Sequence, residues 1–137
     1  MDNKQKLQNL GPNTEDKMRI VARWLHEKQG KDIKALNVEG ICSITEGVVL
    51  ATANNLRHGQ ALADFVLDMC DENKIPFSGM EGYKTGTWLL VDLNDVLVHI
   101  FQGESRGFYN LEGLWSEAPE LELDLPEDED DEDDFDD

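Results

Sequence analysis

The aspartates Asp92 and Asp95 are the side chains most suggestive of chemistry, because paired carboxylates can hold Mg²⁺ for phosphoryl or nucleotidyl transfer. Such transfer requires carboxylates that converge on one metal ion and a Gly-Ser turn that cradles phosphate. This pair instead brackets an expected hairpin turn, and no Gly-Ser dipeptide occurs in the sequence. We therefore expect a protein that is not an enzyme and that uses no metal or other cofactor.

The two cysteines offer neither a metal site nor an activated nucleophile. Cys42 and Cys70 lie far apart, and neither belongs to a C-x-x-C motif or to a Cys/His pair at metal-ligand spacing. The sequence supports no Ser-His-Asp or Cys-His arrangement either. It also lacks an apolar signal-peptide core and any run approaching the roughly 20 apolar residues that span a bilayer. These features predict a reduced, cytoplasmic chain without a membrane partner.

The dipeptide Arg57-His58 is a third candidate, at the start of a predicted helix. A cation in a first helical turn opposes the helix dipole, so an acidic neighbour or a bound anion is expected to compensate for it. A structural role is the first interpretation, and direct contact with a partner is the alternative. Arg106 and Tyr109 carry the same two interpretations, since either could line a docking surface.

Two apolar runs, 88–93 and 96–101, flank the dipeptide Asn94-Asp95 and predict a β-hairpin. Asn and Asp tolerate the left-handed backbone of a two-residue turn, and this loop length fixes the pairing register. One face of the hairpin then carries aliphatic pairs: Leu93 with Val96, Val91 with Val98, and Leu89 with Ile100. The opposite face, called the mixed face below, carries the pairs Asp92 with Leu97, Leu90 with His99, and Trp88 with Phe101.

The chemistry of the two hairpin faces predicts different roles for them. The aliphatic face suits a hydrophobic core. The mixed face combines aromatic rings, leucines, a carboxylate and an imidazole, which suits a protein interface with Trp88 as its anchor. The alternative is that Trp88 and Phe101 lie beneath a helix, with His99 as a core histidine whose hydrogen bonds are satisfied.

The apolar periodicity of the remaining chain predicts one α/β domain with a mixed sheet and flanking helices. In chain order it indicates a helix capped by Thr14 and stopped by Gly30, central strands at 35–38 and 48–53, a helix capped by Asn54 or Asn55 and ending near Glu72, an edge strand within 76–83, and a last helix that begins near Ser105 and contains Phe108, Leu111, Leu114 and Trp115. The domain is expected at 14–118, after a polar lead-in at 1–13.

Charge is concentrated at the carboxyl end of the chain. The formal net charge is −18, but residues 120–137 hold 13 of the 30 acids and no Lys or Arg, leaving 17 acids against 12 bases. A net-negative body argues against direct or sequence-specific nucleic-acid binding, which needs clustered bases. A basic protein partner fits better.

Residues 119–137 are expected to form a disordered acidic tail, because such a run repels itself and buries little apolar surface. A solvating role is the first interpretation, and competition for a basic protein surface, or shielding of the domain from nucleic acid, is the alternative. Leu121, Leu123 and Leu125 alternate with acids as in a strand, but isolated leucines among carboxylates seldom form one.

Several motifs between about Thr14 and Ser116 together carry a family resemblance. They are L-N-V, S-I-T, V-V-L-A-T, R-H with A-D after it, W-L-L-V-D-L-N-D-V-L-V-H-I-F, and F-Y-N-L-E-G-L-W. In this combination the chain resembles the ribosomal silencing factor family, also called Iojap or RsfS. The resemblance implies a nucleotidyltransferase-like α/β fold without transfer chemistry. It also implies binding to the large ribosomal subunit through its ribosomal protein numbered fourteen, which blocks small-subunit joining.

The resemblance assigns docking to the hairpin region and needs no cofactor, since obstruction is steric. The implied partner-binding residues are Trp88, Leu90, Asp92, Leu93, Asp95, Leu97, Phe101 and Tyr109. Alternatives are an assembly factor for the large subunit that uses the same surface, or a nucleotidyltransferase-like enzyme. We expect a monomer or a weak homodimer.

The chain departs from the family pattern near its first strands. Glu46-Gly47-Val48 replaces the usual D-Y-F, Ala53 replaces the last residue of A-T-G, and Asn37 replaces the usual acid. The missing aromatic at Gly47 removes any contact that this ring makes in the family. Asn94, where many members have glycine, still permits the turn because asparagine also adopts positive φ.

Overall fold

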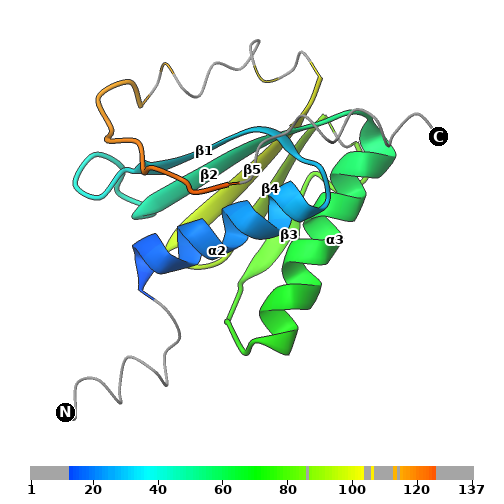
Figure 1. The fold of residues 1–137 in the computed structure, drawn as a ribbon, viewed down its shortest axis with the longest axis horizontal. Helices are drawn as coiled ribbons and strands as arrows, with labels where there is room; N and C mark the ends of the chain where they lie inside the picture. Colours follow the sequence, from blue (N-terminus) through cyan, green and yellow to red (C-terminus); the bar gives the residue numbers. More distant parts are fainter. Residues whose placement is uncertain (1–12, 86, 104–105, 107–112, 114, 126–137) are drawn as a thin grey trace.

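Two helices pack side by side on one face of a twisted β-sheet (Figure 1). The computed structural model describes residues 13–85, 87–103, 106, 113 and 115–125. The elements in chain order are α2 (Thr14–Glu27), β1 (Lys31–Asn37), β2 (Gly47–Ala53), α3 (Leu56–Glu72), β3 (Gly79–Glu81), β4 (Trp88–Asp92) and β5 (Val96–Gln102). Within the described residues the sheet has five strands in the order β1-β2-β5-β4-β3. Strands β2 and β5 are parallel and the other neighbours antiparallel, which confirms the predicted mixed α/β fold.

Helix α2 begins one residue earlier than a Thr14 cap requires, because Asn13 is its cap. The Asn13 side chain accepts a hydrogen bond from the Asp16 amide at 2.8 Å, which satisfies an amide without an intrahelical partner. Thr14 is thereby the first helical residue, and its hydroxyl turns toward the hairpin. The helix ends before Gly30, as predicted, and the Gly30 amide donates to the Leu25 carbonyl.

Helix α3 confirms the predicted cap and length. The Asn55 side chain accepts from the His58 amide at 2.8 Å, and the helix runs to Glu72. Its buried face contains Leu62, Val66 and Cys70 at helical spacing, and this face packs on the sheet.

The prediction of two central strands is confirmed for β2 and wrong for β1, which is an edge strand. Its start at Lys31 precedes the predicted Ala35 by four residues, with an irregular register between Lys31 and Lys34. Ala35 and Leu36 are buried although they lie at an edge. Their apolar side chains are typical of a central strand, which is why the sequence pattern predicted one. Strand β3 is a short edge strand inside the predicted range.

The segment 119–125 explains why an edge strand is buried. The Asn37 amide donates to the Pro119 carbonyl at 2.9 Å, and the Leu121 amide donates to the Ala35 carbonyl at 2.8 Å. Leu121 is only 8% exposed and belongs to the core cluster shared with the helices. The expectation of disorder is therefore wrong for 119–125, which we call the strap. Residues 126–137 lie outside the described part of the chain.

The sheet separates two apolar clusters, whereas the hairpin pattern predicts only the one that contains its aliphatic face. The larger lies between the sheet and the helices and contains the whole aliphatic face of the hairpin. The smaller lies on the opposite face and contains Leu36, Val38, Val48, Leu50 and Phe101. Trp115 and Ala118 pack against this second cluster. The predicted helix from Ser105 falls mostly outside the described residues.

Candidate docking surface

The hairpin has the predicted register at every pair. β4 and β5 pair Trp88 with Phe101, Leu90 with His99, and Asp92 with Leu97. The turn is closed by the Leu93 amide, which donates to the Val96 carbonyl at 2.9 Å. Asn94 has a φ of +79°, the left-handed conformation expected of it. One oxygen of Asp92 accepts a hydrogen bond from the Asn94 amide at 2.8 Å, so this carboxylate shapes the turn.

Asp95, in contrast, anchors the hairpin to helix α2. Its carboxylate accepts hydrogen bonds from the Lys17 ammonium at 2.6 Å and from the Thr14 hydroxyl at 2.5 Å. Its backbone carbonyl accepts from the amides of Glu46 and Gly47. The predicted partner contact at Asp95 therefore competes with a set of internal bonds. The Asp95 carboxylate faces a lysine and that of Asp92 faces a backbone amide, an arrangement unlike two ligands on one metal ion.

Lys17 and Asp95 form a largely buried ion pair. The side chain of Lys17 is 6% exposed and that of Asp95 is 31% exposed. Burial by itself would raise the pKa of the Asp95 carboxyl, but hydrogen bonds from Lys17 and Thr14 and the lysine charge hold this pKa below its usual value. Lys17 also donates to the Leu93 carbonyl at 3.2 Å. These contacts fix the turn relative to the helix.

The mixed face forms a partly exposed surface on the side of the sheet away from the helices. Trp88, Leu90, Asp92 and Leu97 are each partly exposed there. Strand β3 extends this surface, since Glu81 lies opposite Leu90. A hollow of about 220 Å³ lies between these strands and is lined by Ser78, Gly79, Met80, Glu81, Leu90 and Asp92. Sequence reasoning missed the contribution of β3, because a three-residue strand has too little periodicity to reveal its pairing.

An aromatic cluster supports this surface from below. The ring centroids of Trp88 and Phe101 are 5.4 Å apart, and those of His99 and Trp115 are 6.0 Å apart. The Trp88 indole N–H donates to Nδ1 of His99 at 3.0 Å, so the neutral imidazole carries its proton on Nε2. Among the described residues this buried Nε2 has no hydrogen-bond partner. Burial lowers the pKa of His99 to about 4, so the ring is neutral at pH 7.

Two of the predicted contact residues lie beneath the surface. Phe101 and Leu93 are fully buried, so they support the surface without forming it. The alternative interpretation is correct in part: Phe101 and His99 are buried, and Trp115, which belongs to the predicted last helix, packs with Ala118 against the cluster that contains Phe101. Trp88 is not fully covered. Tyr109 lies outside the described residues.

Of the pair Arg57-His58, the histidine has a structural role. Nδ1 of His58 accepts from the Asn54 amide at 2.9 Å, and its Nε2 lies 2.8 Å from the Lys28 carbonyl. The histidine thus joins the start of α3 to the end of α2. Arg57 is exposed.

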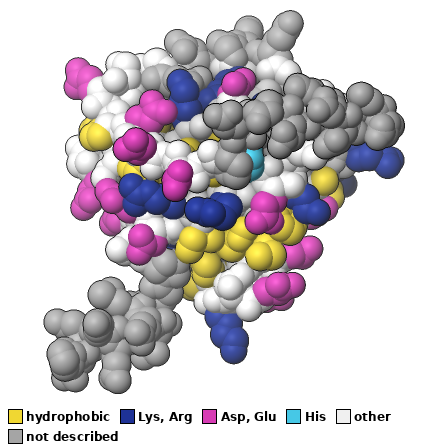
Figure 2. Space-filling view, viewed as in Figure 1, with side chains coloured by type: hydrophobic (Ala, Val, Ile, Leu, Met, Phe, Trp, Pro, Cys, Tyr) yellow, Lys and Arg dark blue, Asp and Glu magenta, His cyan; other side chains and the backbone are white. Residues whose placement is uncertain are grey.

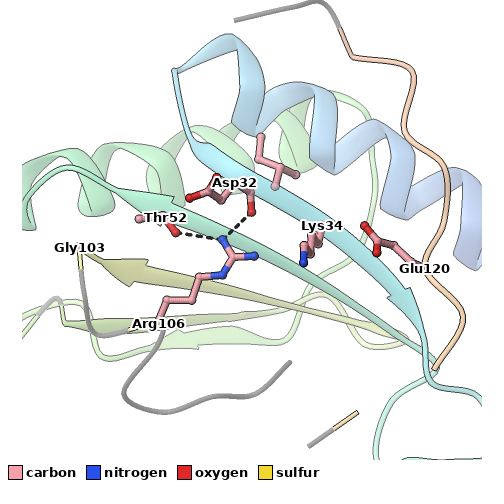
Figure 3. A pocket seen from close by; sticks show the side chains of 7 residues that line it. Asp32, Lys34, Thr52, Gly103, Arg106 and Glu120 are labelled. Atoms are coloured by element: carbon pink, nitrogen blue, oxygen red, sulfur yellow. Dashed lines mark hydrogen bonds between the residues drawn. The ribbon is translucent and has the colours of Figure 1, made fainter. Parts of the chain in front are cut away.

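Arg106 lies at the β1 edge of the sheet, away from the hairpin turn. Its guanidinium donates to the Asp32 carbonyl and to the Thr52 hydroxyl, which bridges β1 and β2 (Figure 3). A hollow of about 500 Å³ lies beside it, and Lys34 and Glu120 line it as well. These bonds indicate a structural role for Arg106.

Charge distinguishes the mixed face from the helical face. On the helical face, Lys and Arg side chains are interspersed with Asp and Glu (Figure 2). Strands β3, β4 and β5 contain no Lys or Arg, and Glu81 and Asp92 lie on their mixed face. In the described ranges no three His, Cys, Asp or Glu side chains are grouped to hold a metal ion. No helix in that part of the chain has the length and apolar character of a membrane span.

The comparisons with known proteins all point to one family. A family model described as "Ribosomal silencing factor during starvation" matches residues 12–137. The "Ribosomal silencing factor RsfS" of Bacillus subtilis is 39% identical over 113 residues, covering 82% of this chain and 96% of that protein.

Two further proteins extend the comparison. A crystal structure of a Bacillus halodurans protein matches with a TM-score of 0.71 at 31% identity, covering 80% of this chain and all of that one. A mouse protein named "Mitochondrial assembly of ribosomal large subunit protein 1" is 27% identical over 100 residues, covering 71% of this chain and 44% of its own length. From its sequence and its fold, the chain belongs to the ribosomal silencing factor family.

Proposed function

We propose that this protein is a cytoplasmic translation regulator that binds the large ribosomal subunit and prevents the small subunit from joining it. Family membership supports a ribosome-associated role, since the Bacillus subtilis relative is named a ribosomal silencing factor. The docking partner is the large-subunit ribosomal protein numbered fourteen. The bound domain acts as a steric obstacle, which requires no catalysis and no cofactor.

One observation carries the docking assignment: the mixed face is a partly exposed, rigidly supported surface with an aromatic anchor. Trp88 is fixed by its hydrogen bond to His99 and by the ring of Phe101. Leu90 and Leu97 add apolar area, and aromatic and aliphatic anchors of this kind dominate binding energy at interfaces. Asp92 and the absence of bases from strands β3 to β5 favour a basic partner surface.

A second function uses the same surface. The mouse relative is named for assembly of the mitochondrial large subunit, and this name favours a role in large-subunit maturation. A factor that binds the joining surface would act on both immature and mature subunits. Silencing predicts an effect on purified mature subunits, whereas a purely assembly role predicts none.

Sedimentation with purified ribosomal subunits tests the proposal. The protein should sediment with large subunits and not with small subunits, and adding it before the small subunit should reduce the amount of joined ribosomes. Failure to bind mature large subunits would refute the proposal. Binding without any effect on joining would favour the assembly role.

Variants at Asp92 test the proposal that the partner presents a basic surface to the mixed face. Asp92→Asn retains an acceptor for the Asn94 amide and so preserves the turn, while it removes the charge. Asp92→Lys reverses the charge and should slow association most strongly at low salt. Equal association rates for wild type and Asp92→Lys would exclude a basic surface opposite this residue.

A further inference from the structure

The loop between β1 and β2 displays two large apolar side chains to solvent. Ile44 is 73% exposed and Ile41 is 50% exposed, more than any other large apolar side chain in the described part of the protein. Single exposed apolar residues are common on protein surfaces, but two within four residues of one loop form a local apolar patch. The departures from the family pattern at Glu46-Gly47-Val48 begin at the last residue of this loop.

Backbone hydrogen bonds close the loop at its ends and form a turn within it. The amides of Ile41 and Cys42 donate to the Val38 carbonyl, and the Val38 amide donates to the Glu46 carbonyl. The Thr45 hydroxyl lies 2.9 Å from the Asp95 carbonyl, so the loop is joined to the hairpin turn. The isoleucines are thus presented by a preorganised segment, and preorganisation reduces the entropy cost of binding.

A hollow of about 490 Å³ lies between this loop and the hairpin turn. It is lined by Glu39, Gly40, Cys42, Ser43, Ile44, Thr45, Glu46, Asn94 and Asp95. The lining contains three carboxylates and no Lys or Arg. Asp95 is already paired with Lys17, which leaves the charges of Glu39 and Glu46 at the rim, where the Glu46 carboxylate lies 3.0 Å from the Thr14 hydroxyl.

The hollow is continuous with the mixed face through the hairpin turn. Asn94 lines the hollow, and its amide is bonded to Asp92, which lies on the mixed face. The Ser78 hydroxyl, beside β3, also bonds the Asn94 side chain. A partner seated on the mixed face therefore meets the rim of the hollow without a gap in protein surface.

We infer that the 39–46 loop and the hairpin turn form a second contact of the docking surface, which accepts a lysine or arginine side chain from the same basic protein partner. The alkyl stem of that side chain packs on Ile44, and its cation lies between Glu39 and Glu46. Ribosomal RNA does not fit, because its phosphates would meet carboxylates. This inference rests on the proposed function and adds the chemistry of a second contact.

Binding to purified large subunits by matched variants tests the inference. Ile44→Ser should weaken binding about tenfold, while Leu56→Ser changes another exposed apolar residue at the far start of α3 and should have no effect. Glu39→Lys should weaken binding by a similar factor, about tenfold, whereas Asp68→Lys on the exposed side of α3 should not. All four positions are exposed, so folding should be preserved, and a melting curve checks this for each variant.

The thiol of Cys42 provides an independent local readout. The chain has two cysteines, and only Cys42, which lines the hollow, is accessible. Cys70 is buried, and burial raises its pKa to about 11, so it remains unreactive. Alkylation of Cys42 by a maleimide, followed by the intact mass of the chain, should be at least ~10-fold slower when large subunits are bound at 100 times the dissociation constant.

The outcomes separate this inference from the proposed function. If wild type binds and Trp88→Ala weakens binding, yet Ile44→Ser and Glu39→Lys bind like wild type and Cys42 reacts at its free rate, the second contact is refuted and the proposed function stands. Tighter binding by Glu39→Lys would instead indicate that phosphates face the loop and would also refute it. If wild type does not bind at all, both proposals fail together.

Discussion

Trp88 can act as an anchor only if its indole is held in place, and His99 holds it. The indole N–H donates to Nδ1 of a neutral imidazole, and the rings of Phe101 and Trp115 confine that imidazole. Protonation of His99 would replace the acceptor with a donor and break this bond. Position 99 therefore controls the orientation of the anchor although it has almost no surface of its own.

The pKa of His99 predicts a pH dependence of stability. A histidine with a pKa of about 4 in the fold and about 6.5 when unfolded takes up its proton mainly in the unfolded state. Its stabilising effect is therefore complete above pH 6.5 and is lost as pH falls toward 4. The free energy of unfolding should decrease by about 2 kcal/mol between pH 7 and pH 5 through this residue.

The measurement is urea unfolding at several pH values for wild type and His99→Gln. Glutamine keeps an acceptor for the indole but does not titrate, so the difference between the two proteins should itself depend on pH in this window. The pairing of Asp95 adds its own loss only below the usual carboxyl range, because the pKa of that residue is lowered. A constant difference from pH 7 to pH 5 would show that His99 does not titrate as proposed.

At the scale of elements, the ion pair between Lys17 and Asp95 holds the hairpin turn on helix α2. Lys17→Met should destabilise the protein by about 2 kcal/mol, because a partly buried carboxylate loses its partner. Arg19→Met is the matched control: Arg19 lies 3.9 Å from Glu15 in an exposed pair, and its loss should cost under about 0.5 kcal/mol. Chemical denaturation of both variants at neutral pH measures the difference, and equal effects would contradict this role for Asp95.

The strap is the second connection between elements, because residues 119–121 close the free edge of β1. A chain ending at Leu125 should melt within a few degrees of the full chain, since residues 126–137 are mostly acids that repel one another. A chain ending at Pro119 should melt well below both, because Leu121 leaves the core, and Leu121→Ala should cost about 2 kcal/mol. Circular dichroism measures the melting temperature of each truncated chain. Equal melting temperatures would show that the strap does not stabilise the fold.

Features set by residues close together in the sequence could be predicted, whereas features set by contacts between distant segments could not. The hairpin and its two faces were predictable because a two-residue turn fixes the register of every later pair. The edge position of β1 was not, because a segment more than 80 residues away buries Ala35 and Leu36. For the same reason Lys17 escaped notice as the partner of Asp95, since only the folded chain brings helix and turn together.

The side chains that share the face of the candidate site were predictable from the sequence, but the extent to which each of them is buried was not. Trp88, Leu90, Asp92 and Leu97 were correctly assigned to one face, but alternation alone cannot tell a covered position from an exposed one. Phe101 is buried because Trp115 and Ala118, distant in sequence, cover that end of the strand. The acidic hollow beside the turn had no sequence signal, because its lining comes from two separate loops.

At the scale of the whole molecule, the two faces of the sheet differ in how they are covered. Helices α2 and α3 cover one face, while the mixed face of strands β3 to β5 keeps a partly exposed surface (Figure 1). A binding protein that acts as an obstacle needs this division: one face provides the stability and the other provides the contact. If the mixed face docks on the large subunit as proposed, the helical face, with its interspersed charges (Figure 2), points away from that subunit.

The most direct test of this account is the affinity of Trp88→Ala for purified large subunits, measured beside Leu56→Ala and wild type. Loss of a central aromatic anchor of about 2 kcal/mol predicts roughly 30-fold weaker binding and a matching loss of the block on subunit joining. Leu56→Ala, far from the mixed face, should behave like wild type. If a folded Trp88→Ala protein binds large subunits and blocks joining as wild type does, the mixed face is not the docking surface and the central claim is wrong.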